Sequence, residues 1–390
     1  MFGEPTMPMP PKPIEMISSL IAVPSISSTT PKWDHSNLGV IELLHAWCES
    51  LGFQCEVMPV PNNPGKANLI ATLGTGPGGL VLSGHTDTVP CDPELWKSDP
   101  FKVEERDQKL YGLGTCDMKG FLALAIEAAK QYKDTPLQAP LIILATADEE
   151  SSMSGARALV DAGKPKARAA LIGEPTSLKP IRMHKGMMME AVRIEGQAGH
   201  SSDPSLGANA LEAMNGVMNE LLTIRSELQA RYQNSNFRID VPTMNLGCIH
   251  GGDNPNRICG QCELEFDLRP LPGMSMDGLR NLISDRLKPI EQKHRVDLNV
   301  RSLFPGIPPF EQSESEFVDC VERLTGHKAE AVAFGTEAPF LQQMGMQTLV
   351  LGPGSIDQAH QPDEFLALDQ FAPTLDLLHN LINQYCVKGC

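Results

Sequence analysis

The sequence predicts an α/β fold in which a mostly parallel sheet is flanked by helices and a smaller α+β domain is inserted. Apolar, strand-like runs alternate with helical segments up to Glu174, the pattern of a parallel sheet covered by helices. From about Arg182 the order changes to strand, helix, strand, strand, helix, strand, which is typical of a ferredoxin-like unit. Alternating elements return after residue 302, so the small unit interrupts a larger domain.

The larger domain begins with a helix expected over residues 38–51, where apolar side chains recur at helical spacing. Its apolar positions are Val40, Leu44, Trp47 and Leu51. A second helix is expected over residues 121–132, after a glycine-flanked turn. Four buried strands are predicted from apolar runs that begin at Leu80, Leu141, Ala169 and Thr348.

The inserted domain is expected over residues 182–302, which leaves a discontinuous larger domain of residues 1–181 and 303–390. Its helices are predicted along the apolar stripe 211–221 and over 276–287. Its strands are predicted over residues 187–194, 243–249, 262–268 and 296–300. Cys259 and Cys262 open the third strand, and strand packing is favoured over a zinc site because no second cysteine pair completes one.

Composition limits the classes of partner. At 390 residues, of which 41% are hydrophobic, the chain is expected to form two domains with substantial cores. Its net charge of -16 repels nucleic acid and anionic membrane surfaces, so neither is expected as a partner. No run is long enough to span a membrane, and residues 1–13 lack the features of a secretory signal. Ten scattered cysteines favour reduced thiols, so we expect a cytoplasmic protein.

Potential metal ligands follow each of the four predicted strands. Because ligands bind beyond the carboxyl ends of strands in open α/β sheets, these side chains are expected to converge. The pattern therefore indicates a catalytic metal site. The residues are His85 and Asp87 after the first run, Asp148, Glu149 and Glu150 after the second, Glu174 after the third, and His360 after a glycine-rich turn that follows the fourth.

Each signal also has a simpler interpretation when it is taken alone. A histidine two residues before an aspartate is often just held by that carboxylate, and Asp117, at a turn before a helix, could be an N-cap. Three adjacent acids could form a solvated turn. However, the acids repel one another at the mouth of an apolar strand, and cations would relieve that repulsion. Glu150 could then bind metal while Glu149 faces bound water as a general base.

Charge balance favours two metal ions over one. Asp117, Glu150 and Glu174, together with a bridging hydroxide, neutralise two divalent cations. Mixed imidazole and carboxylate ligands suit Zn²⁺, with Co²⁺ or Mn²⁺ as possible substitutes.

Taken together, these segments resemble the dinuclear zinc aminoacylase and carboxypeptidase superfamily, nearly from end to end of the chain. The resemblance implies a zinc-exopeptidase-like fold in which His85 and Glu174 bind one metal, Glu150 and His360 bind the other, and Asp117 bridges them. It also implies that Glu149 is the general base, that Asp87 orients His85, and that the Asp117–Met118 peptide bond is cis. The matching stretches are 83–90, 110–121, 145–150, 172–185, 199–204, 250–262, 335–340 and 349–364.

The resemblance extends to the inserted domain, where His200 matches a histidine that reaches the neighbouring subunit's site and polarises the scissile carbonyl. It therefore implies a homodimer formed through the inserted domain. Substrate contacts are implied for Asn256 and Arg269, and also for Thr336 and Lys185. Cys116 stands where a small residue is common, and we expect its thiol to pack without reacting.

The implied activity is hydrolysis of N2-acetyl-L-ornithine to L-ornithine and acetate, a step of arginine biosynthesis, through a metal-bridged hydroxide. The alternatives are succinyl-diaminopimelate desuccinylase, another hydrolase of N-acyl-amino acids, or a dipeptidase. A dimeric binding protein with only a structural metal is a further alternative. Retention of Glu149 argues against it, because structural metal sites are usually closed and need no spare base.

Overall fold

The computed structural model describes residues 9–389, which form two compact units. Unit 1 contains the chain up to Arg182, then Gln312–Glu330, and then the chain from Glu337 onward. Unit 2 contains Met183–Glu311 and Ala331–Thr336. Residues 303–311 and 331–336 thus pack with unit 2, whereas the sequence placed them in the larger domain. The segment 303–311 includes β13, whose partner strand β8 crosses the unit boundary between Arg182 and Met183.

The larger sheet has a parallel centre, as the sequence predicts. Strands β6, β3, β7 and β15 run parallel in that order, and their carboxyl ends share one edge. The adjacent strands on either side, β2 and β8, are antiparallel to them. In spatial order the sheet contains β1 (Gln54–Pro59), β2 (Ala67–Leu73), β6 (Leu141–Thr146), β3 (Leu80–His85), β7 (Ala169–Pro175), β15 (Gln347–Gly352), β8 (Ile181–His184) and β13 (Phe310–Glu311), with β14 (Glu330–Val332) beside β8.

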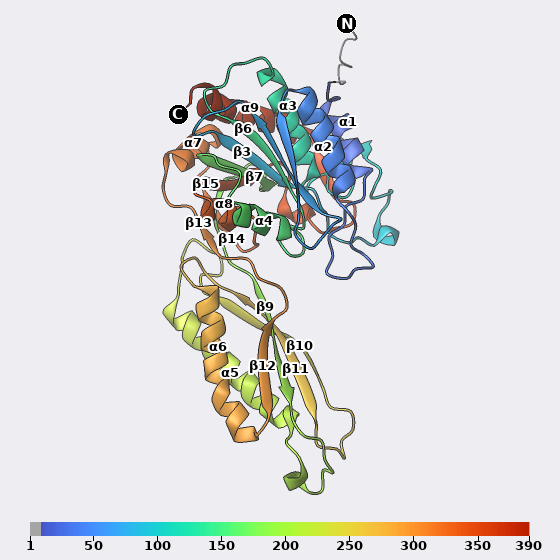
Figure 1. The fold of residues 1–390 in the computed structure, drawn as a ribbon, viewed down its shortest axis with the longest axis vertical. Coiled ribbons are helices and arrows are strands. Elements are labelled where there is room, and N and C mark those ends of the chain that lie inside the picture. The colour runs from blue at the N-terminus through green and yellow to red at the C-terminus, as the bar shows by residue number, and fades with distance from the viewer. Residues whose placement is uncertain (1–8, 390) are drawn as a thin grey trace. The chain divides into compact units, whose positions relative to one another are not determined.

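Helices cover this sheet (Figure 1). Among the central strands, β3, β6 and β7 are buried along their whole length. The helices of unit 1 are α1 (Pro13–Ile21), α2 (Leu38–Ser50), α3 (Lys119–Ala129), α4 (Ser154–Ala162), α7 (Glu316–Thr325), α8 (Ala338–Gln343) and α9 (Phe371–Ile382). A close approach fixes α3 against β7, because a Cβ at Gly173 would lie only 2.0 Å from the ring of Phe121. A small sheet of β4 (Glu104–Arg106), β5 (Lys109–Tyr111) and β16 (Phe365–Ala367) completes the unit.

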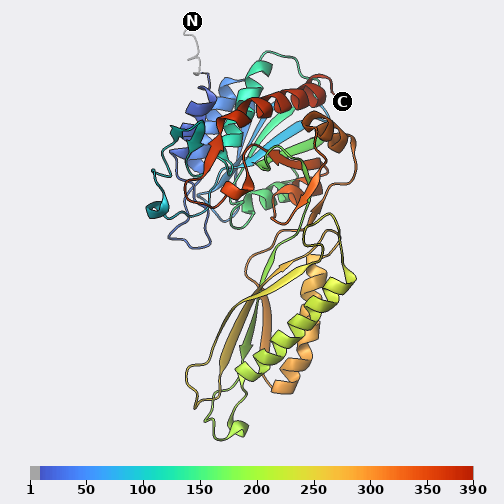
Figure 2. The same ribbon diagram turned by 180° about the vertical axis from the view of Figure 1, so that it is seen from behind.

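Unit 2 has the predicted element order, and its sheet is antiparallel with the strand order β10, β11, β9, β12. Its two helices pack side by side on one face of that sheet (Figure 2). Helix α6 continues seven residues past the predicted end and contains Pro289. The elements are β9 (Met188–Glu195), α5 (Ala210–Arg231), β10 (Thr243–Gly251), β11 (Gln261–Arg269), α6 (Met276–His294) and β12 (Asp297–Ser302). The structure therefore confirms the predicted fold class.

Cys259 and Cys262 both lie in the hydrophobic core of unit 2, and the cysteines of the described residues are free thiols. Among residues 9–389, no helix is both long enough and apolar enough to cross a membrane.

Candidate metal centre

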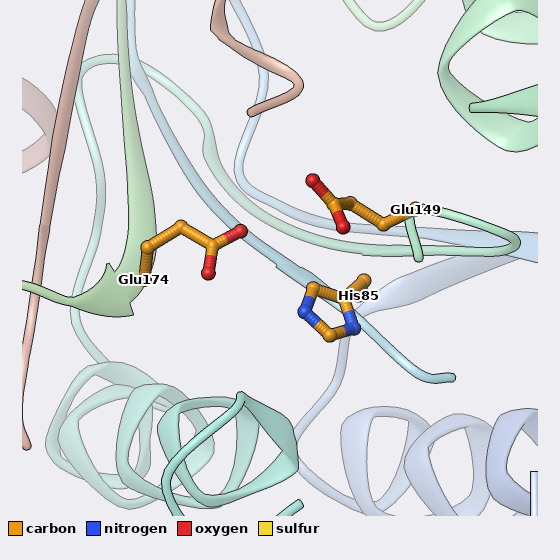
Figure 3. Close-up of side chains that lie close together, drawn as sticks. All are labelled: His85, Glu149 and Glu174. Carbon is orange, nitrogen blue, oxygen red and sulfur yellow. The ribbon is translucent and has the colours of Figure 1, made fainter. Parts of the chain in front are cut away.

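The carboxyl edge of the parallel strands brings acidic and imidazole side chains together within unit 1. His85 is the last residue of β3, Glu174 lies near the end of β7, and Glu149 and Glu150 follow β6. Two groups have ligand atoms within 4.8 Å of one another: His85 with Glu149 and Glu174, and His85 with Asp117 and Glu150. Figure 3 shows the first group, in which two carboxylates from different elements point toward the imidazole.

The imidazole of His85 lies between a backbone carbonyl and the carboxylates of the centre. Its Nδ1 lies 2.9 Å from the backbone carbonyl of Asp87, which can only accept, so this nitrogen carries a proton and donates it. Nε2 faces Asp117 Oδ1 at 3.1 Å. Burial lowers the pKa of His85, but the hydrogen bond to Asp117 and the charge of Glu174 outweigh burial and raise the pKa well above its usual range. Because the backbone holds Nδ1, Nε2 is the nitrogen that can bind a cation in place of its proton.

Asp87 supports the centre in a way that the sequence did not indicate. Its carboxylate is 3.7 Å from His85 Nδ1, farther than its own backbone carbonyl. Its Oδ2 instead accepts a hydrogen bond from the backbone N–H of Glu150 at 3.0 Å. Asp87 is fully buried, so one residue ties the β3 exit to the turn that carries Glu150.

Asp117 and His360 are brought to the same place by a buried carboxylate. The Asp117–Met118 peptide bond is cis, as the resemblance implies. Glu364 Oε1 accepts hydrogen bonds from the backbone N–H groups of Cys116 at 2.7 Å and Asp117 at 3.0 Å, and its other oxygen accepts from Gly114 at 3.0 Å. Because Glu364 follows His360 by four residues, this contact joins two ligand-bearing loops.

His360 lies at the solvent side of the centre, with its side chain 55% exposed. Its Nε2 is 3.0 Å from Glu150 Oε2 and 3.7 Å from Asp117 Oδ2. The hydrogen bond to Glu150 raises the pKa of His360 to about 8. His360 therefore adjoins the second group, although it comes from a loop more than two hundred residues away in sequence.

The acidic run after β6 is divided between two roles, which corrects the interpretation that its three acids all repel one another. Asp148 points away from the centre and pairs with Lys66, whose Nζ is 2.8 Å from Asp148 Oδ1 and 2.8 Å from Asp34. The hydroxyls of Ser27 and Ser154 also donate to Asp148. Only the two glutamates are left to face the centre.

The remaining carboxyls carry an electrostatic conflict that cations would resolve. Burial, reinforced by the charge of Glu174, raises the pKa of Glu149 well above its usual range. Burial and the charge of Asp117 likewise raise the pKa of Glu174 well above its usual range, and raise that of Glu150. For Asp117 burial acts in the same direction, but the hydrogen bond and charge of His85 outweigh it and lower the pKa. This oxygen-rich and imidazole donor set fits divalent metal ions.

Five of the sequence-predicted site residues lie in unit 2. His200 is exposed, and its Nδ1 accepts a hydrogen bond from the backbone N–H of Ser202 at 3.2 Å. Asn256 lies beside it, because its carbonyl accepts a hydrogen bond from Ser201 at 3.1 Å. Arg269 ends β11 and donates to Asp267 at 2.9 Å.

Lys185 and Thr336 form a separate cluster in unit 2. The Nζ of Lys185 donates to the carbonyl of Val241 at 2.7 Å, and burial lowers the pKa of Lys185. The backbone N–H of Thr336 donates to Nε2 of His184 at 3.3 Å. Burial also lowers the pKa of His184 to about 4, so this imidazole is neutral and can accept.

Sequence reasoning missed three buried residues that hold the centre: Lys66, Glu337 and Glu364. Glu364 could have been found from its spacing of four residues after His360, as part of a histidine-acid loop. Lys66 and Glu337 carry no local signal, because each meets its partner only through sheet packing. Burial raises the pKa of Glu337 to about 7, and its Oε2 accepts a hydrogen bond from Thr146 at 2.9 Å.

Cys116 adjoins Asp117 without offering a reactive thiol. Its side chain is 2% exposed, and burial raises its pKa far above that of a free cysteine. The Sγ lies 3.6 Å from the carbonyl of Ser355 and close against Gly354. Because the thiolate is the nucleophilic and metal-binding form, this environment favours inert packing.

Comparison with known proteins places this centre in a family. A model of peptidase family M20/M25/M40 matches residues 81–384, which include all the ligand-bearing strands. The chain belongs to this family. The match confirms the resemblance seen in the sequence, and the family is one of dinuclear metal-dependent hydrolases.

Relatives of this family cover nearly the whole chain. The acetylornithine deacetylase of Edwardsiella ictaluri is 51% identical over 96% of this chain and 98% of its own length. That of Pectobacterium carotovorum is 50% identical over 96% of this chain and 97% of its own length.

Solved structures share the fold at low identity. The aminopeptidase PepT of Bacillus cereus has a TM-score of 0.74 at 19% identity, covering 96% of this chain and 98% of its own. A dinuclear metal-binding peptidase of Bacillus subtilis has a TM-score of 0.66 at 15% identity, covering 95% and 96%.

Proposed function

We propose that the chain is a metal-dependent amidohydrolase that converts N2-acetyl-L-ornithine to L-ornithine and acetate. The observation that carries this proposal is the identity of about half of all residues, over 96% of the chain, with several acetylornithine deacetylases. The convergent imidazole and carboxylate side chains in unit 1 support the chemistry. We place the reaction in arginine biosynthesis, because its product is ornithine.

The residues that would hold two divalent cations are those of the centre in unit 1. We assign His85 and Glu174 to one cation, Glu150 and His360 to the other, and Asp117 to both. Zn²⁺ is the proposed ion, with Co²⁺ or Mn²⁺ as substitutes. When bound, such ions supply an acidified water and an electrophile for the acyl carbonyl.

Glu149 is proposed as the general base. It accepts a proton from the attacking water, whose oxygen forms a bond to the acyl carbon. When the C–N bond breaks, Glu149 delivers that proton to the departing amine, so that acetate and ornithine leave with all atoms accounted for. Asp87 positions both sides of the centre, through its carbonyl to His85 and its carboxylate to the backbone of Glu150.

The assignments in unit 2 follow from the resemblance. We propose that His200 donates to the oxyanion in the partner subunit's site of a homodimer, formed through unit 2. Asn256, Arg269, Thr336 and Lys185 are proposed to contact the substrate. The free thiols of the described chain support a cytoplasmic location.

The test is release of ornithine by protein stripped with a chelator, before and after addition of Zn²⁺ or Co²⁺. The proposal expects metal-dependent release from N2-acetyl-L-ornithine, and much slower cleavage of succinyl-diaminopimelate. Preference for succinyl-diaminopimelate would contradict the proposed substrate. No turnover of any compound in a panel of acyl-amino acids would contradict the proposal that the chain is an amidohydrolase.

A variant series tests the base in the same assay. Glu149→Ala is expected to bind metal and lose activity by about a hundredfold or more, since a positioned base contributes about 10²–10⁴ in rate. Asp148→Asn tests the neighbouring acid, which faces Lys66 and is expected to affect stability more than kcat. Full activity in Glu149→Ala protein with bound metal would exclude Glu149 as the base.

A further inference from the structure

A buried carboxylate outside the ligand set lies behind the centre. Glu337 precedes α8 and is 1% exposed. One of its oxygens, Oε2, accepts the hydroxyl of Thr146 at 2.9 Å. The other, Oε1, has no hydrogen-bond partner within residues 9–389. Placing a carboxyl in such a site without full hydrogen bonding is unfavourable, so its retention calls for a reason other than packing.

Thr146, which it contacts, is the last residue of β6 and is also 1% exposed. In the parallel register it lies directly beside His85. Its carbonyl accepts two hydrogen bonds from Thr86, one from the backbone N–H at 2.9 Å and one from the hydroxyl at 2.7 Å. Thr146 therefore connects the carboxyl end of β3 to the carboxyl end of β6.

The segments that follow the carboxyl ends of β3 and β6 carry residues of the centre. His85 directly precedes Thr86, and Glu149 follows Thr146 by three residues. A shift of Thr146 would be transmitted to the imidazole through the paired hydrogen bonds, and to Glu149 through the backbone of a three-residue segment. The hydroxyl of Thr146 also lies 3.4 Å from the carbonyl of Gly84, a longer contact than the one to Glu337. Loss of the hydroxyl–carboxylate contact therefore leaves the hydroxyl only this weaker acceptor, or leaves the buried carboxylate without a partner.

We infer that Glu337 is a positioning residue, which acts through the hydroxyl of Thr146 to set His85 and Glu149 for hydrolysis and for metal binding. This inference rests on the proposed function for its kinetic consequences, but not for its effect on metal affinity. Groups that orient metal ligands in this way typically contribute about 10–100-fold to affinity or activity.

Four variants and one matched control separate this role from packing. Glu337→Ala and Thr146→Val each remove the contact, and the double variant removes both partners. Glu337→Gln keeps an amide oxygen that can accept the hydroxyl. Thr348→Val is the matched control, because Thr348 is equally buried, belongs to β15 of the same sheet, and its hydroxyl donates to the nearby carbonyl of Met346 at 3.1 Å.

The readouts are kcat and KM with the acetyl-ornithine substrate, and Zn²⁺ affinity by competition with a chelator. Each single variant is expected to lower kcat by about tenfold at nearly constant KM, and to weaken Zn²⁺ binding by about tenfold. The double variant should be no worse than either single, because both changes remove one contact. Glu337→Gln and Thr348→Val should remain within about threefold of the parent, a band well inside that tenfold effect.

Three results would overturn the inference: losses that multiply in the double variant, a Glu337→Gln variant as impaired as Glu337→Ala, or equal losses in Thr348→Val. If the parent protein shows no turnover, the proposed function fails. The Zn²⁺ affinities of the same variants then decide the positioning role by themselves.

Discussion

Replacing Lys66 by methionine removes the cation that lies behind the acidic turn while keeping most of the side-chain volume. Lys66 is 1% exposed, and its Nζ lies 2.8 Å from both Asp34 and Asp148. Removing one partner of a buried ion pair costs about 3–5 kcal/mol. Water can solvate Asp34, which is 28% exposed, and the hydroxyls of Ser27 and Ser154 still donate to Asp148. We therefore expect a loss of about 3 kcal/mol in the free energy of unfolding, the lower end of that range.

Urea denaturation followed by tryptophan fluorescence measures this loss in unit 1, because all three tryptophans lie there. They are Trp33, Trp47 and Trp96. Urea is uncharged and does not screen the ion pair. The control is Lys97→Met, whose Nζ lies 2.9 Å from Asp363 but whose side chain is 78% exposed, so its loss should stay below about 1 kcal/mol. A Lys66→Met variant within about 1 kcal/mol of the parent would refute the reasoning, since it would show that burial does not strengthen this pair.

Three other predictions concern packing, pH and thiol reactivity. Gly173→Ala should destabilise unit 1 by about 3 kcal/mol or more through overpacking against α3, whereas Gly65→Ala, with only ordinary contacts at 3.7 Å or beyond, should change urea stability by less than about 1 kcal/mol. Equal effects would contradict the close approach. The neutral imidazole of His184, with a pKa of about 4 when folded, contributes stability that is complete above the unfolded pKa of about 6.5 and is lost as pH falls toward 4. Hydrogen exchange of unit 2 peptides should show this loss, about 3 kcal/mol by pH 4, and a His184→Phe variant that keeps the full pH dependence would contradict it. Iodoacetamide should label Cys248 in native protein and leave Cys116 unmodified, as peptide mass spectrometry would show, because the first is partly exposed and the second is buried with a raised pKa. Early labelling at Cys116 would show that its pocket opens.

The strand ends explain why so much of the centre could be predicted. His85, Glu149 and Glu174 each follow an apolar run that can only be a buried strand, and parallel strands deliver their ends to one edge. Convergence then follows from topology, without knowledge of any distance. Asp117 was more difficult, because its turn position suits a helix cap equally well. In the structure the N-cap residue of α3 is Met118, and Asp117 Oδ1 lies 3.1 Å from Nε2 of His85.

The supporting residues could not be predicted for a different reason. In the sequence, Asp148 is the first of three adjacent acids that would repel one another. In the structure it pairs with Lys66, which lies more than eighty residues earlier in the chain, and points away from the centre. Glu337 lies almost two hundred residues from Thr146. Such contacts depend on side-chain directions across packed layers, which hydrophobic periodicity does not specify.

The sequence by itself determined the α/β class, the inserted ferredoxin-like unit and the types of candidate ligand, because periodicity and residue chemistry are local properties of the chain. The tertiary structure alone decided which acids face the centre, which nitrogen of His85 faces those acids, and where the unit boundary passes between Thr336 and Glu337. Those outcomes depend on how buried charges find partners. A carboxylate in a low-dielectric interior must be paired, and its partner can come from any part of the chain that packing brings within about 3 Å.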